Sequence, residues 1–148
     1  MGEDLALTTS AIMSRVERLE DDSAAFYEKL ASRFEEGRQA FQEFAEESGK
    51  NKTHLLRTYQ ETISDALEAT FSFQGLDLSG LEVALPEEVS LKEALKIALR
   101  LEKRASSFYT QIAEQSQSLL ATIPRAFSRV ARKREARIEV LQEMLERA

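Results

Sequence analysis

Two stretches of the chain repeat each other: residues 18–31 read RLEDDSAAFYEKLA and residues 100–113 read RLEKRASSFYTQIA. Each contains Arg-Leu-Glu and then, at the same distance, Phe-Tyr and a final alanine, so that Glu20 matches Glu102. Apolar residues in both stretches recur every three or four positions, which predicts an amphipathic helix. The repetition of this helix in the two halves of one chain predicts two similar units related by a pseudo-twofold axis.

The same periodicity extends beyond the repeat and predicts four helices. Gly37 separates the first from the second, Ser90 and Glu93 form a capping box that opens the third, and Pro124 is tolerated in the first turn of the fourth. Residues 71–90 contain two glycines and one proline and have no sustained helical period, so we predict a connection there. The expected helices cover about residues 9–36, 38–70, 91–118 and 123–147.

The lengths of the connections predict the topology. The first and second helices, and likewise the third and fourth, are joined by short turns, so each pair is expected to form an antiparallel hairpin. The connection over residues 71–90 is long enough to run the length of a bundle. We therefore predict an all-α, ferritin-like four-helix bundle of two antiparallel hairpins joined by a long crossover, in a single domain spanning residues 1–148.

Composition excludes several classes of function. The chain has no cysteine, which rules out disulfides, thiolate metal sites and iron–sulfur clusters. Its formal net charge of −6 argues against nucleic acid as a partner. No apolar run is long enough for a membrane span, and the first ten residues do not resemble a secretory signal. A cytoplasmic protein is the resulting expectation.

The two repeated stretches resemble the glutamate-bearing first and third helices of the rubrerythrin-like branch of the ferritin superfamily. In that family each of these helices supplies one carboxylate to a di-iron site, and the second and fourth helices each supply a Glu-x-x-His pair. The resemblance implies that Glu20 and Glu102 are the single carboxylates and that His54 is the second-helix histidine. At the remaining three ligand positions other residue types stand, namely Asn51, Arg134 and Arg137.

Arg134 points to a replacement for the metal independently of the family. It lies on the apolar stripe of its helix, four residues after Val130 and four before Ile138. An arginine at such a position is rarely buried without a partner. By the pseudo-symmetry its partners are predicted to be Glu20 and Glu102, so a buried Glu–Arg network is expected in preference to a di-iron centre, with no cofactor bound.

Other interpretations of these residues stay open. Glu20, Glu102 and His54, with Glu47 nearby, could form a reduced mononuclear site for iron or zinc. Glu20 and Glu102 could equally be partly exposed charges on the helix flanks, and His54 a structural or surface residue. Tyr27 and Tyr109 each lie seven residues after a repeated glutamate; they either hydrogen-bond the site carboxylates, as in rubrerythrin-like proteins, or pack in the core.

A basic cluster in the fourth helix has its own interpretation. Arg129, Arg132 and Lys133 are expected to form a solvated flank that pairs with Glu135 and Glu139. The alternative is a docking patch for an acidic partner.

Two functions follow from the resemblance. The first is a non-catalytic scaffold or interaction protein that keeps the bundle and has lost the metal centre. The second is a non-haem iron oxidoreductase of rubrerythrin type, removing peroxide or dioxygen under oxidative stress. Because the chain has no Cys-x-x-Cys pair, such an enzyme would need an external electron donor. Pairing of helix surfaces into a homodimer would fit this superfamily.

Overall fold

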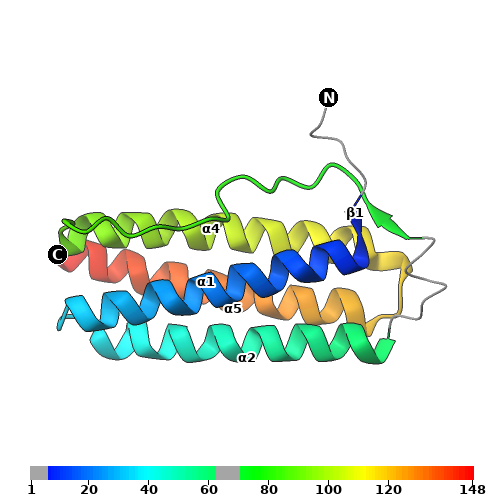
Figure 1. The fold of residues 1–148 in the computed structure, drawn as a ribbon, viewed down its shortest axis with the longest axis horizontal. Coiled ribbons are helices and arrows are strands. Elements are labelled where there is room, and N and C mark those ends of the chain that lie inside the picture. Colours follow the sequence, from blue (N-terminus) through cyan, green and yellow to red (C-terminus); the bar gives the residue numbers. More distant parts are fainter. Residues whose placement is uncertain (1–6, 63–70) are drawn as a thin grey trace.

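The computed structural model describes residues 7–62 and 71–148, and within these ranges four long helices lie side by side (Figure 1). A single turn of 3-10 helix, η2 (Ser116–Ser118), lies between the last two, and two short strands, β1 (Leu7–Thr8) and β2 (Ser72–Phe73), pair antiparallel at one end. The all-α four-helix bundle is confirmed. Its helices are α1 (Thr9–Arg33), α2 (Arg38–Thr62), α4 (Leu91–Gln115) and α5 (Thr122–Arg147).

The order of the helices in space follows from the connections. Helices α1 and α2 run antiparallel, and so do α4 and α5 (Figure 1). From β2 the chain returns along the length of the bundle beside α4, so that α2 and α4 run in the same direction. None of the helices in the described ranges combines the length and the apolar character needed to cross a bilayer.

The first turns of α1 and α4 are capped by hydroxyl side chains. Thr8 caps α1 through its hydroxyl, which accepts a hydrogen bond from the Ala11 N–H at 3.0 Å, and the capping box of Ser90 and Glu93 opens α4 as predicted. The predicted end of the first helix at residue 36 is wrong. Helix α1 stops at Arg33 because Phe34 is extended, although its N–H still bonds the Leu30 carbonyl.

Two other boundaries differ from the prediction. The third helix ends at Gln115, and its predicted last turn, residues 116–118, is tightened into η2. The predicted extension of the second helix over residues 63–70 lies outside the described residues. Gly37 makes the turn between α1 and α2 with a φ of 86°, a left-handed conformation that favours glycine. A Cβ built on it would lie 2.2 Å from Met144 Cε, so the flexible end of that side chain would have to move.

The core is apolar along most of the bundle but charged at its middle. Phe41, Leu95, Phe108 and Leu141 are among the fully buried apolar side chains that hold the helices together. The largest of all the buried side chains, however, are two arginines of α5. Burial of a charged group costs free energy unless it is paired, so the residues around these arginines define the candidate site.

Candidate functional site

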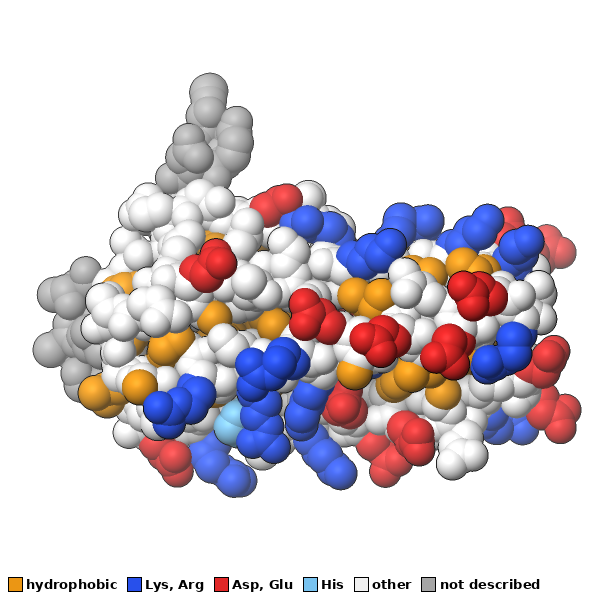
Figure 2. All heavy atoms as spheres, turned by 180° about the vertical axis from the view of Figure 1, so that it is seen from behind, with side chains coloured by type: hydrophobic (Ala, Val, Ile, Leu, Met, Phe, Trp, Pro, Cys, Tyr) orange, Lys and Arg blue, Asp and Glu red, His pale blue; other side chains and the backbone are white. Residues whose placement is uncertain are grey.

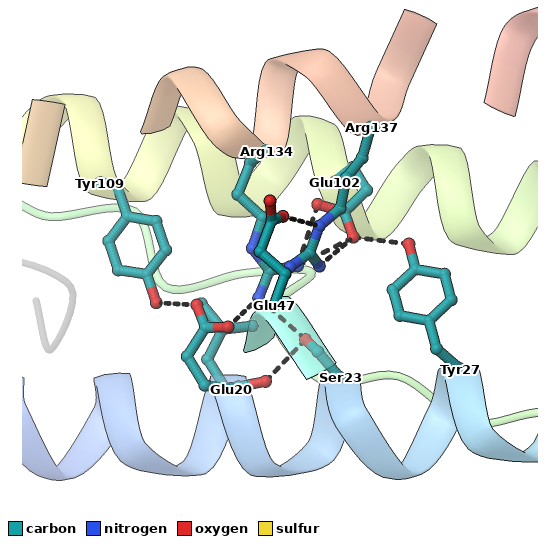
Figure 3. A network of polar contacts seen from close by, with 9 residues as sticks. Glu20, Ser23, Tyr27, Glu47, Glu102, Tyr109, Arg134 and Arg137 are labelled. Atoms are coloured by element: carbon teal, nitrogen blue, oxygen red, sulfur yellow. Dashed lines mark hydrogen bonds and ion pairs between the residues drawn. The ribbon is translucent and has the colours of Figure 1, made fainter. Parts of the chain in front are cut away.

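The site is a network of polar contacts with charged side chains at its centre (Figure 3). Glu20 comes from α1, Glu102 from α4, and Arg134 and Arg137 from α5; each is at most 1% exposed. Glu47 of α2 joins from the edge and is 32% exposed. Every helix of the bundle therefore contributes a charged group to one cluster.

Arg134 lies between the two glutamates of the sequence repeat. Its Nη1 donates to both carboxylate oxygens of Glu102, at 2.9 and 2.8 Å. Its Nη2 lies 2.9 Å from Glu20 Oε1, an ion pair whose angle does not meet the geometry of a hydrogen bond, and donates to Ser23 Oγ at 3.0 Å. Glu20 and Glu102 are the two partners that the pseudo-symmetry of the repeat predicted for Arg134. A bridging guanidinium of this kind ties α5 to α1 and α4 at once.

Arg137 continues the network toward α2. Its Nε donates to Glu47 Oε1 at 2.8 Å and its Nη1 to Glu102 Oε2 at 3.2 Å. The guanidinium carbon also lies 5.7 Å from the ring centroid of Tyr27 and 5.4 Å from that of Phe44, within range of a cation–π interaction. Glu47, which one interpretation of the sequence placed near a mononuclear metal site, pairs with this arginine.

The two repeated tyrosines bond the two repeated glutamates crosswise. Tyr27 of α1 donates to Glu102 of α4 at 2.5 Å, and Tyr109 of α4 donates to Glu20 of α1. Both rings are fully buried and pack against other aromatic rings, Tyr27 against Phe44 and Tyr109 against Phe127. Each tyrosine thus does both of the things left open by the sequence: it packs in the core, and its hydroxyl holds a carboxylate.

The electrostatics of the site favour the charged form of both partners. Burial raises the pKa of Glu102, but the attraction of Arg134 and Arg137 outweighs burial, so the pKa lies below the usual value. Burial likewise lowers the pKa of Arg134, and the attraction of Glu102 and Glu20 more than compensates, so its pKa is raised. Two buried carboxylates and two guanidiniums are neutral as a set.

The tyrosines should resist ionisation. Burial raises the pKa of Tyr27 and Tyr109 well above 10, and the neighbouring carboxylates Glu102 and Glu20 raise it further. Because their pKa is raised in the folded state, the stabilisation that these two tyrosines provide is fully present below about pH 10. It is lost as the pH rises through the folded pKa. In a Tyr59→Phe variant, which keeps only these two phenols, we expect the phenolate absorbance to appear together with loss of the helical circular dichroism. Phenolate formation near pH 10 in a chain that stays helical would contradict this expectation.

His54 does not join the network. It lies half-buried on α2, where burial lowers its pKa and Arg129, Lys133 and Arg57 lower it further. Lys and Arg side chains surround it on the face shown in Figure 2. Within the ranges described, no group of three His, Cys, Asp or Glu residues is arranged to hold a metal ion. The structure therefore brings Glu20 and Glu102 together and leaves His54 outside.

The basic patch around the histidine consists of His54 and Arg57 from α2 with Arg129 and Lys133 from α5. Glu135 and Glu139 were predicted to pair with Arg129, Arg132 and Lys133, and that prediction is wrong. None of the ion pairs between described residues joins them to Arg129, Arg132 or Lys133. At 100° per residue, a step of six residues turns Glu135 about 120° away from Arg129, onto another side of α5.

Asn51, which the resemblance would place where a glutamate ligand stands, is buried at 1% exposure. Neither polar atom of its side chain has a hydrogen-bond partner in the described part of the protein, and the same holds for Arg137 Nη2 and Ser48 Oγ. Ser23 is a further member that the sequence did not reveal. Its hydroxyl donates to the Leu19 carbonyl at 2.7 Å and accepts from Arg134. The repeat could not have found it, because the matching residue in the second half is Ala105.

The side chains present do not fit a di-iron centre. Two adjacent ferrous ions need carboxylate and imidazole ligands whose charge balances theirs. Here the centre holds two guanidiniums, which cannot deprotonate and which repel a dication at short range. The carboxylate oxygens that would face a metal are already taken by Arg134, Arg137 and the two tyrosines. What this arrangement can do chemically is fix the four helices in one register.

Compared with models of protein families, with curated proteins and with solved structures, the chain gives no match.

Proposed function

We propose that this chain is a ferritin-like bundle of the rubrerythrin-like branch that has lost its di-iron centre and acts as a non-catalytic scaffold or interaction protein. One observation carries the proposal: the guanidinium of Arg134 lies between the carboxylates of Glu20 and Glu102, where the resemblance implies metal ions. The side-by-side hairpins and the crossover along the bundle (Figure 1) support the ferritin-like arrangement.

The charges support a structural role for the network. In relatives of this type four carboxylates would balance two ferrous ions. In this chain Arg134 and Arg137 provide the positive charge that balances Glu20 and Glu102. Buried ion pairs add little net stability, because desolvation offsets the Coulomb attraction, but removing one partner is costly. Such a network would select one packing of the helices over others.

The basic patch supports the interaction part of the proposal. His54, Arg57, Arg129 and Lys133 gather on one face of a chain whose net charge is −6, and the three permanent cations among them form no ion pair within the described ranges. An acidic segment of a partner protein would neutralise this face.

Metal analysis tests the loss of the metal centre. After growth and reconstitution with ferrous iron, we expect the purified protein to hold far less than one iron, manganese or zinc ion per chain by plasma mass spectrometry. Glu20→Ala, and Glu17→Ala as an exposed control on the same helix, should leave the metal content unchanged. Near-stoichiometric iron that Glu20→Ala removes and Glu17→Ala retains would overturn the proposal and favour the oxidoreductase, working with an external electron donor.

A further inference from the structure

A pocket of about 680 Å³ lies between the crossover and α4, apart from the charged network. From its lining and its charge we propose that it binds a medium-chain aliphatic carboxylate. Its volume is in the range of pockets that take small organic molecules. The proposal goes beyond the scaffold function and does not depend on it, since the pocket uses none of the network residues.

The walls of the pocket are apolar and come from two separate segments. The crossover supplies one wall and α4 the other, so the pocket exists only because the crossover runs beside this helix (Figure 1). Contact with methylene groups removes apolar surface from water on both sides, which favours an aliphatic chain over a polar ligand. The apolar lining residues are Val83, Ala84, Pro86, Ile97 and Leu101.

Two arginine contacts fix the crossover on either side of the segment that covers the pocket. Arg104 donates to the Ser79 carbonyl at 3.0 Å and pairs with Asp77 at 2.7 Å. Arg33 donates to the Pro86 carbonyl at 2.7 Å. Between these anchors, residues 80–85 make no hydrogen bond to any described residue of the helices. This segment, which we call the strap, is held against the helices by the buried side chain of Leu81 rather than by hydrogen bonds.

The rim of the pocket is positively charged. Arg100 and Lys103 both line it, both are exposed, and neither forms an ion pair in the described part of the chain. Glu82 of the strap lies at the same rim, so two free cations face one carboxylate. The net positive rim beside an apolar interior matches a ligand with an anionic head and an aliphatic tail.

Calorimetric titration of the full chain with octanoate tests the proposal, with acetate and octanol as probes of the head and tail alone. We expect octanoate to bind, acetate to give no binding, and octanol to bind more weakly than octanoate. Arg100→Glu with Lys103→Glu should weaken octanoate by about tenfold, because two rim charges are reversed. Glu82→Gln should tighten it. Lys92→Glu with Lys96→Glu, on the same helix but outside the pocket, should change it little.

Filling the pocket provides the second arm. Ile97→Trp from the helix side, and Ala84→Trp from the exposed strap, should each abolish octanoate binding. If Ile97→Trp unfolds the bundle, Ala84→Trp still tests the site because it leaves the helices untouched. Absence of octanoate binding, unchanged binding in the Ala84→Trp variant, or equal loss in the Lys92 and Lys96 control would each overturn the assignment. None of these results bears on Arg134 and its partners.

Discussion

Replacing Arg134 by leucine is expected to lower the free energy of unfolding by about 3–5 kcal/mol, the usual cost of removing one partner from a buried ion pair. The variant leaves Glu20 fully buried with only the hydroxyl of Tyr109 to hold its carboxylate, because its contact with Arg134 is gone. Glu102 keeps Arg137 and Tyr27. Urea denaturation followed by circular dichroism measures the change. Arg132→Leu, an exposed arginine on the same helix, should stay within about 0.5 kcal/mol of the original chain.

The double variant Arg134→Leu with Glu20→Leu separates charge pairing from lost packing. Since the second change removes the carboxylate that the first leaves unpaired, the two together should cost clearly less than the sum of the single changes. Strict additivity of the two free energies would show that Arg134 and Glu20 do not interact in the folded protein.

Replacing Glu102 by glutamine has the second large effect, and it depends on pH. Glu102 contacts both arginines and Tyr27, so its neutralisation should cost about 3–5 kcal/mol at neutral pH. Its folded pKa lies below the usual glutamate value of about 4.5, so its contribution is present above that value and is lost as the pH falls through the folded pKa. The stability difference between the original chain and Glu102→Gln should therefore shrink steadily below about pH 4.5.

Urea midpoints of both proteins between pH 7 and pH 3 measure this difference. Glu17→Gln, an exposed carboxylate on α1, serves as the control and should show no such convergence. A gap that stays constant down to pH 3 would mean that Glu102 is not held in its charged form by the arginines.

Much of the fold could be predicted because local signals agreed. The apolar stripes placed all four helices, the short and long connections fixed which of them pair, and the capping box of Ser90 and Glu93 set the start of α4. Arg134 could be placed in the core for a simple reason. A charge on an apolar stripe needs buried partners, and the repeat offered only Glu20 and Glu102.

His54 shows where the repeat stops being informative. Arg134 and Asn51 are matched by the repeat and both are buried. Three residues later Arg137 is buried as well, but its match His54 is only half-buried and lies outside the network. After one buried residue of an apolar stripe, the next buried residue lies either three or four positions later in the helix. The packing of each helix against its neighbours decides between these two positions. On α2 the buried residue is Leu55, four positions after Asn51.

The pocket under the strap could not be predicted for a different reason. Leu81, Val83 and Leu85 alternate with Glu82 and Ala84, which indicates the side chains that turn inward but not the helix that they lie against. Their position is set by Arg33 and Arg104, which bond the backbone carbonyls of the crossover. Contacts of a side chain with a distant backbone carbonyl leave no pattern in the sequence.

The claim that arginine takes the place of metal is tested most directly by X-ray diffraction from crystals grown with ferrous iron, measured on both sides of the iron absorption edge. We predict the guanidinium of Arg134 between Glu20 and Glu102, with no anomalous peak at the centre of the bundle. An iron peak between the two carboxylates, with Arg134 and Arg137 turned toward solvent, would contradict the account.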